Sequence, residues 1–260
     1  MKTAYGDHIA VSLDGHVATV TIDKPPNNHV SVDLMRDLAD GMEDADRNNQ
    51  VRAVVLRSAG KPFCAGADLV APDGIAARGM GGINALYDQA VRLFSVETPI
   101  IAAVQGAAVG AGLGLALVAD FRIAAPEARF SANFVKLGFH PGFGLTYTLP
   151  RLIGHQRAEL MFLTGRRVKA EEALGWGLVD EVVPLEGLTA AAQALALEIA
   201  ENAPLAVVAT RKTLRGDVAT AVRAQTAHEH EQQTILRATS DFAEGVLAVQ
   251  ERRAGRFTGT

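Results

Sequence analysis

A run of 21 residues without a charged side chain, 99–119, constrains the fold of this chain more than any other feature. The run is long enough for a membrane-spanning helix. However, Pro99 opens it, and Gln105 and four glycines interrupt it. A buried strand, a glycine turn and a buried helix explain this pattern better than a continuous apolar helix does. We therefore expect a buried core segment and no membrane span.

Other segments repeat this alternation of strands and helices. Asp14-Gly15 stands between two stretches of alternating apolar residues, which predicts a β-hairpin. Ser31 can cap a following helix that has one apolar face. Residues 51–60 predict another buried strand that ends in a turn, and 186–250 predict several helices in succession. The pattern indicates an α/β fold with parallel core strands and a helical C-terminal region.

Composition narrows the possible functions. A chain of 260 residues can form one large domain, or a domain with an appendage. Its net charge is −4 and no basic patch stands out, so nucleic acid is not an expected partner. Cys64 is the only cysteine, which fits a reducing compartment. The first residues contain no long apolar stretch of the kind found in secretory signals, and we expect a cytoplasmic protein.

Several enzyme motifs are incomplete. Gly110 and Gly112 match the first two glycines of a dinucleotide-binding fingerprint, but Leu115 stands at the third position. No Gly-x-Ser-x-Gly elbow is present. In "HEHEQ", Gln232 stands where a zinc-binding helix would place its second histidine, so we expect no metal site and read this segment as a solvated polar face. Cys64 is expected to be a packed residue rather than a nucleophile.

Two glycine-turn loops remain, over 63–69 and 105–115, and each follows a predicted buried strand. Turns of this kind present backbone N–H groups without obstruction by side chains. If both loops face one point, the N–H groups of Ala67 and Ala111 could hold one carbonyl oxygen. The second of these donors would lie at a helix N-terminus, where the helix dipole also favours negative charge.

The blocks "VRAVVLRSAGKPFCAGADL", "PIIAAVQGAAVGAGLGLALVADFRIA", "ARFSANFVKLGFHPGFG" and "LPRLIGHQRAELMFLTGRRVKAEEALGWGLVDEVV" resemble the enoyl-CoA hydratase/isomerase (crotonase) family over nearly the whole chain. The resemblance implies an α/β spiral of ββα units over 1–195 that holds a coenzyme A thioester. It implies a helical oligomerisation region over 196–260, and a homotrimer or a dimer of trimers.

By position, the resemblance makes the Ala67 and Ala111 N–H groups the oxyanion hole for the thioester carbonyl. It implies coenzyme A as part of the substrate and no permanently bound cofactor. It further implies a set of substrate-binding positions: Pro26, Asn28, Ala65, Asp68, Leu69, Val109, Gly114, Asn133, Phe134 and Gly142.

The chain lacks acidic side chains at the positions where members of this family carry their catalytic acids. The two glutamates of a hydratase correspond to Gly114 and Phe134, and a third acid of some relatives corresponds to Gly142. Because general acids and bases typically contribute about 10²- to 10⁴-fold each, efficient hydration by two glutamates is doubtful. The chain could instead perform another proton transfer or thioester reaction, or bind a coenzyme A thioester without catalysis.

Other side chains of the same loops could move a proton. His140 is the candidate acid or base, because a histidine titrates near neutral pH, although a loop histidine bonded to the backbone is the favoured interpretation. His29 is expected to be a contact or surface residue rather than a base. Tyr87 and Tyr147 could reach the acyl pocket.

Overall fold

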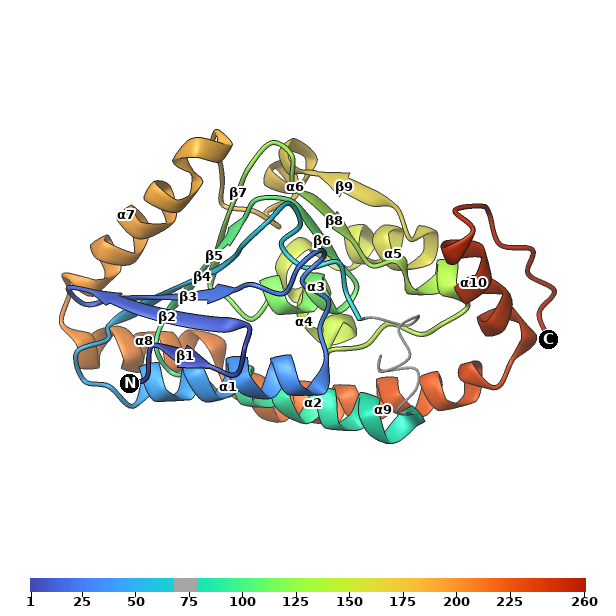
Figure 1. The fold of residues 1–260 in the computed structure, drawn as a ribbon, viewed down its shortest axis with the longest axis horizontal. Coiled ribbons are helices and arrows are strands. Elements are labelled where there is room, and N and C mark those ends of the chain that lie inside the picture. The colour runs from blue at the N-terminus through green and yellow to red at the C-terminus, as the bar shows by residue number, and fades with distance from the viewer. Residues whose placement is uncertain (68–78) are drawn as a thin grey trace.

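The computed structural model describes residues 1–67 and 79–260, and its centre is a twisted seven-stranded sheet (Figure 1). In sheet order its strands are β1 (Ala4–Tyr5), β2 (Ile9–Asp14), β3 (Val17–Ile22), β4 (Ala53–Ser58), β5 (Ile100–Val104), β7 (Phe121–Ala124) and β10 (Glu181–Val182). The pairs within β1–β3 are antiparallel, and every pair from β3 to β10 is parallel. The expected α/β class with a parallel core is confirmed.

Local signals in the sequence explain how the first elements begin and end. The β2–β3 hairpin pairs Asp14 with Val17, and Gly15 takes a φ of +54° in the turn, a region that favours glycine. The Ser31 hydroxyl accepts a hydrogen bond of 3.2 Å from the Leu34 N–H and so caps α1 (Val32–Asp46), as expected.

The parallel strands are buried on both faces, because alternate side chains enter two different cores. Val54 and Leu56 of β4 pack in the core beneath α1 and α2 (Gly79–Ser95). Ala53 and Val55 pack on the opposite face against α7 (Leu188–Ala200), which follows η2 (Leu185–Gly187). Figure 1 shows α1 and α2 on one side of the sheet and α7 on the other. This burial on both faces explains why the core strands are almost continuously apolar.

A second sheet of three short strands joins the loops that lead to the site. It consists of β6 (Ala107–Val109), β8 (Arg129–Ser131) and β9 (Arg167–Lys169) in that order. The short helix α3 (Ala111–Ala116) follows β6 directly and is entirely buried. The segments after β8 are η1 (Asn133–Leu137), α4 (Leu145–Ile153), α5 (His155–Thr164) and α6 (Ala170–Trp176).

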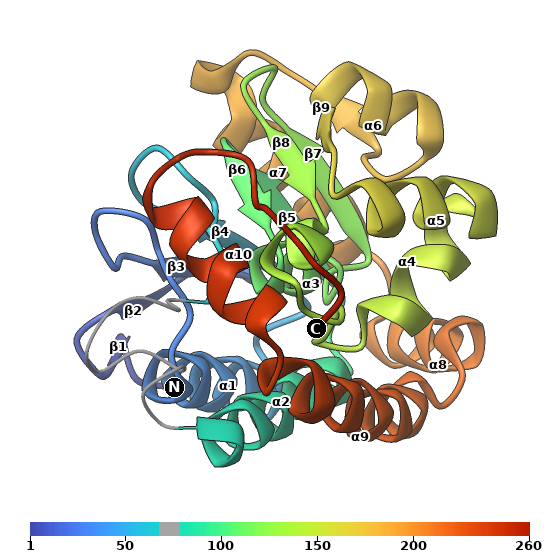
Figure 2. The same cartoon turned by 90° about the vertical axis from the view of Figure 1, so that its right-hand side faces the viewer.

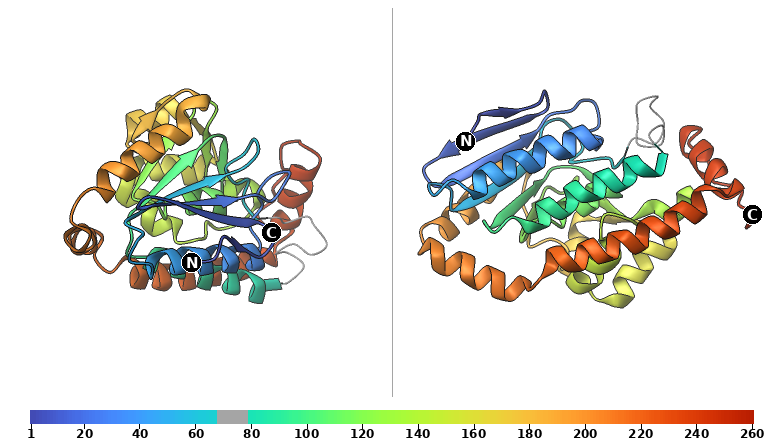
Figure 3. Two further views of the ribbon diagram at one scale, coloured as in Figure 1. Left: turned by 60° about the vertical axis from the view of Figure 1, so that its left-hand side comes forward. Right: turned by 90° about the horizontal axis from the view of Figure 1, so that it is seen from below.

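The C-terminal part is helical, as expected: α8 (Pro204–Arg215), α9 (Val218–Arg237) and α10 (Ser240–Gln250). The expected boundary at 195/196 falls inside α7, which packs on the central sheet as one continuous helix. Seen from below, α1, α2 and α9 lie side by side (Figure 3), and α10 crosses in front of the end of the sheet (Figure 2). Within the described ranges, no helix is both long and apolar enough to cross a membrane.

Candidate active site

The two glycine-turn loops lie directly against each other. The Cys64 N–H donates to the Ala107 carbonyl at 2.9 Å, and the Val109 N–H donates to the Cys64 carbonyl at 3.0 Å. A Cβ atom at Gly112 would lie only 2.1 Å from the Cys64 carbonyl oxygen. Only glycine permits such a close approach of α3 to the first loop.

This contact places the backbone N–H groups of Ala67 and Ala111 near each other. Gly66, with a φ of +96°, directly precedes Ala67, and a Cβ atom built on Gly66 would lie 4.0 Å from the Ala111 nitrogen. The Gly66 carbonyl accepts the Val30 N–H at 2.9 Å. The Ala67 and Ala111 N–H groups donate no hydrogen bond to any residue in the described ranges. Both alanines line the same cavity and can offer these donors to a ligand.

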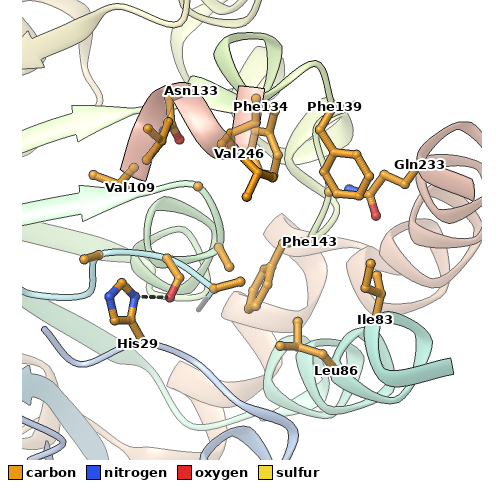
Figure 4. Close-up of a pocket in the computed structure, with 18 of the residues that line it drawn as sticks. His29, Ile83, Leu86, Val109, Asn133, Phe134, Phe139, Phe143, Gln233 and Val246 are labelled. Carbon is orange, nitrogen blue, oxygen red and sulfur yellow. Dashed lines mark hydrogen bonds between the residues drawn. The ribbon is translucent and has the colours of Figure 1, made fainter. Parts of the chain in front are cut away.

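The cavity has a volume of about 720 Å³ and is mainly apolar (Figure 4). Both glycine-turn loops form one wall with Asn27 and His29 of the loop before α1, and residues of α2, η1, the loop before α4, α9, α10 and the segment after α10 complete the cavity. The side chains on these other walls include Ile83, Leu86, Tyr87, Asn133, Phe134, Leu137, Phe139, Phe143, Gln233, Val246, Val249, Gln250 and Arg252. A cavity of this size and lining suits a mostly apolar ligand group with a few fixed polar contacts.

Five of the ten expected substrate-binding positions line this cavity together with the two expected oxyanion-hole residues. The lining includes Ala65, Ala67, Val109, Ala111, Asn133, Phe134 and Gly142. Asp68 and Leu69 lie outside the described residues. Pro26, Asn28, Gly114 and His140 are not among the lining residues.

Asn28 is buried and bound to its own loop instead. Its amide nitrogen donates to the carbonyls of Ala59 at 2.8 Å and Pro62 at 3.0 Å, and its amide oxygen accepts the Lys24 N–H at 2.9 Å. These three bonds use the polar atoms of the side chain on the protein itself. Asn28 therefore holds the first loop in place rather than facing the cavity.

Gly114 is covered by an aromatic ring. A Cβ atom at this position would lie 2.4 Å from Cδ1 of Phe143, which is fully buried and has a φ of +66°. Phe134, which the resemblance aligns with the second glutamate of a hydratase, lines the cavity (Figure 4). Neither position supplies an acid, and at residue 114 the packing leaves no room for one.

Gly142 is covered by a tyrosine. A Cβ atom there would lie 1.8 Å from the phenol oxygen of Tyr87, whose hydroxyl donates to Oε1 of Gln233 at 2.9 Å. Burial, and next the nearby Glu229, raise the pKa of the Tyr87 phenol, so it stays neutral. Tyr87 thus reaches the cavity, as one of the two tyrosines expected there, whereas Tyr147 is not among the lining residues.

The two histidines of these loops differ in position. His140 is half-buried with its Nδ1 at 2.7 Å from the Pro141 carbonyl, and burial lowers its pKa. Its ring lies edge-on to His228, 6.2 Å between centroids. His29 lines the cavity, and its Nδ1 lies 3.2 Å from the Gly66 carbonyl oxygen (Figure 4). Of the two, only His29 reaches the ligand space.

The "HEHEQ" segment differs from its expected solvated face. Glu229 is 0% exposed, and its carboxylate accepts hydrogen bonds from the N–H of Gly144 at 2.7 Å and from the N–H and hydroxyl of Thr146 at 3.0 and 2.5 Å. Burial raises the pKa of Glu229 to about 7, although these hydrogen bonds oppose the rise. The turn of α9 that carries it faces inward because α9 packs against α4 and the loop before it.

We expect Glu229 to make the stability of the protein depend on pH. Because its pKa rises from 4.5 to about 7 on folding, the folded state binds the proton more tightly. The resulting stabilisation is complete below pH 4.5 and is lost as the pH rises through about 7, a loss of about 3 kcal/mol. Between pH 5 and pH 8, the free energy of unfolding should therefore fall about 2 kcal/mol more for the wild type than for Glu229→Gln, as measured by urea denaturation.

Glu231→Gln, at an exposed glutamate on the same helix, is the matched control and should follow the wild type. Parallel pH profiles of the wild type and Glu229→Gln would contradict a raised pKa for this carboxyl group.

Cys64 is not suited to act as a nucleophile at this site. Cys64 is fully buried, and burial raises the pKa of its thiol to about 11, as expected of a packed residue rather than a nucleophile. Among the described residues, no group of three histidine, cysteine, aspartate or glutamate side chains could hold a metal ion. The N–H groups of Ala67 and Ala111, which line the cavity, are the candidates for binding a carbonyl oxygen.

Comparison with known proteins agrees with this geometry. The family profile described as enoyl-CoA hydratase/isomerase matches residues 13–260. The chain belongs to the enoyl-CoA hydratase/isomerase family. Its fold is confirmed by the crystal structure of an enoyl-CoA hydratase/isomerase from Pseudoalteromonas atlantica, with a TM-score of 0.88 and 33% identity over 97% of this chain and 100% of the other.

Two relatives of this enoyl-CoA hydratase/isomerase family member carry names that refer to different reactions. A probable enoyl-CoA hydratase of Mycobacterium tuberculosis is 42% identical over 80% of this chain and 82% of its own. The 1,2-epoxyphenylacetyl-CoA isomerase of Escherichia coli is 34% identical over 97% of this chain and 99% of its own. Membership of the family therefore leaves the reaction open, and the side chains of the site must decide it.

Proposed function

We propose that this protein is an enzyme of acyl-CoA metabolism that polarises a thioester carbonyl between the N–H groups of Ala67 and Ala111. The observation that carries the proposal is that these two donors, unpaired within the described ranges, line one apolar cavity. Proton addition or removal next to a thioester carbonyl makes the carbonyl enolate-like. Fixed donors aimed at that oxygen stabilise the charge that develops in the transition state.

Membership of the family favours a hydration or an isomerisation as the reaction. The side chains at residues 114 and 134, however, do not support hydration through two glutamates. Gly114 lies under Phe143, and Phe134 makes the cavity more apolar. We assign no proton transfer to His140, since its side chain is outside the cavity lining and bonded to its neighbour. A different proton-transfer or thioester reaction, with water as the base, is the second candidate function. A non-catalytic coenzyme A thioester binder is the third, and it is favoured by the loss of all three acids.

The proposed assembly is a homotrimer or a dimer of trimers, held together in part by the C-terminal helices. Leu205 and Leu214 of α8 and Ile235 of α9 are large apolar side chains that are more than half exposed in the single chain. Exposed apolar side chains on neighbouring helices favour contact with a second copy. Light scattering of the purified protein tests this assembly directly.

Turnover of the purified protein on trans-2-enoyl-CoA thioesters of short and long chain tests the proposed reaction. Loss of the conjugated enoyl absorbance is followed, and the product is identified by mass spectrometry. Slow or absent hydration, with thioester binding retained, supports the second or third function. Rapid hydration would show that a group other than the three missing acids activates water, and His29→Ala would then be the next variant.

A further inference from the structure

A polar pair stands in the mainly apolar wall of the cavity. Tyr87 of α2 is 6% exposed and Gln233 of α9 is 0% exposed, and both line the cavity beside Gly142. Figure 4 shows Gln233 on the same side as Ile83 and Phe139. Buried polar side chains are costly unless their hydrogen bonds are made, so each polar atom of this pair needs a partner.

The hydrogen bonds of the pair fix the orientation of the Gln233 amide. The His140 carbonyl can only accept, and it receives a bond of 2.8 Å from Nε2 of Gln233. Oε1 of Gln233 therefore faces Tyr87 and accepts its hydroxyl proton at 2.9 Å. The opposite amide orientation would place two acceptors, Oε1 and the His140 carbonyl, against each other.

This orientation leaves one donor without a partner. An amide nitrogen carries two hydrogens, and the second hydrogen on Nε2 donates to no residue in the described ranges. Gln233 lines the cavity next to Gly142, and only a glycine at residue 142 leaves room for Nε2, because a Cβ atom there would lie 2.6 Å from it. Apolar groups, including Ile83, Phe139 and Phe143, form the surroundings. A ligand atom that accepts this hydrogen bond would be selected strongly over one that cannot.

We propose that Gln233, oriented by Tyr87, forms a subsite for an oxygen substituent, hydroxyl or oxo, on the acyl group of the substrate. This inference rests on the proposed function, because it assumes that a coenzyme A thioester occupies the cavity. A site that hydrogen-bonds a substrate oxygen discriminates strongly against an analogue that lacks it, whereas an apolar pocket discriminates weakly. The subsite therefore names the substrate class: an oxygen-bearing acyl-CoA rather than a plain fatty acyl-CoA.

Binding of unreactive ligands tests the subsite apart from catalysis. The probes are S-(2-oxoalkyl)-CoA analogues, in which a methylene group separates sulfur from the carbonyl. One is unsubstituted, and the others carry a hydroxyl or an oxo group at successive carbons of a chain of the same length. We expect at least one oxygen-bearing analogue to bind the wild type more than 10-fold more tightly than the unsubstituted one, by calorimetry.

Gln233→Met keeps the approximate volume of the side chain and removes the donor. We expect it to abolish this preference while changing the affinity for the unsubstituted analogue less than 3-fold. Gln225→Met, on the same helix but bonded to Thr146 at 2.8 Å, is the matched control and should keep the preference. If Gln233→Met does not fold, Tyr87→Phe is the second variant, and Tyr147→Phe is its control. Tyr87→Phe removes the hydrogen bond that orients the Gln233 amide but keeps the amide donor. It should therefore weaken the preference for the oxygen-bearing analogue without abolishing it.

The outcomes separate the two proposals. Equal binding of all analogues to the wild type, or an equal loss for all of them in Gln233→Met, would overturn the subsite and leave a purely structural pair between α2 and α9. The proposed function would survive that result, because thioester binding would remain. No binding of any analogue to the folded wild type would instead contradict the proposed function itself.

Discussion

Replacing Ala111 by proline should lower kcat/KM on the acyl-CoA thioester that the wild type turns over by about 10²- to 10³-fold, the typical effect of losing one oxyanion-hole donor. Proline removes the N–H that we assign to the carbonyl oxygen. Ala111 is the first residue of α3, a position that tolerates proline because its N–H has no partner within the helix. Gly110 before it has no Cβ to clash with the ring. The variant should therefore fold, and steady-state kinetics measures the loss.

Ala170→Pro is the matched control for this variant. Ala170 is the first residue of α6, the preceding Lys169 is extended, and neither residue lines the cavity. If Ala170→Pro destabilises the protein, its melting temperature should fall while its kcat/KM stays at the wild-type value. An Ala111→Pro protein that folds and keeps wild-type kcat/KM would show that this N–H does not hold the reacting carbonyl.

Glutamates placed at residues 114 and 134, which the resemblance aligns with the two glutamates of a hydratase, should create hydratase activity only when Phe143 is removed as well. In Gly114→Glu with Phe134→Glu, the new side chain at residue 114 meets the Phe143 ring, because even its Cβ would lie 2.4 Å from Cδ1. Overpacking of this kind typically costs about 1–3 kcal/mol, and a buried carboxylate adds to the cost. We expect this double variant to melt well below the wild type and to gain no hydration.

Adding Phe143→Gly opens space beside residue 114, and glycine suits the φ of +66° at that position. We expect this triple variant to hydrate trans-2-enoyl-CoA at least 10²-fold faster than the wild type, since each acid typically contributes about 10²- to 10⁴-fold. The single variant Phe143→Gly, which lacks both acids, is the control. A folded triple variant that hydrates no faster than this control would contradict the view that the missing acids limit hydration.

The parts of the fold that depend on local sequence were predictable. The hairpin at Gly15, the cap at Ser31 and the two glycine loops each follow from the conformational needs of a few neighbouring residues. The same reasoning showed only that the N–H groups of Ala67 and Ala111 could face one point, and the family resemblance assigned both to one oxyanion hole. The structure brings both residues to one cavity.

The contents of that cavity depend on contacts between residues distant in the sequence. Tyr87 and Gln233 are 146 residues apart, and no pattern along the chain pairs them. Glu229 looked solvated because its neighbours are polar, yet α4 and the preceding loop bury it. Gly114 is covered by the ring of Phe143, a residue that takes a positive φ, and the sequence around Gly114 does not predict this contact. The "GFG" motif around that phenylalanine was the only sequence signal for the unusual backbone.

Infrared spectroscopy of a bound thioester carbonyl tests the oxyanion hole most directly, because it needs no turnover. A saturated acyl-CoA labelled with carbon-13 at the carbonyl is bound to the wild type and to Ala111→Pro, and the isotope-edited carbonyl band is recorded. Two aligned N–H donors should shift the band of the wild-type complex to lower frequency than in water, and the shift should shrink in Ala111→Pro. A saturated wild-type complex whose carbonyl band stays at its position in water would contradict the assignment of Ala67 and Ala111 as the groups that activate the substrate.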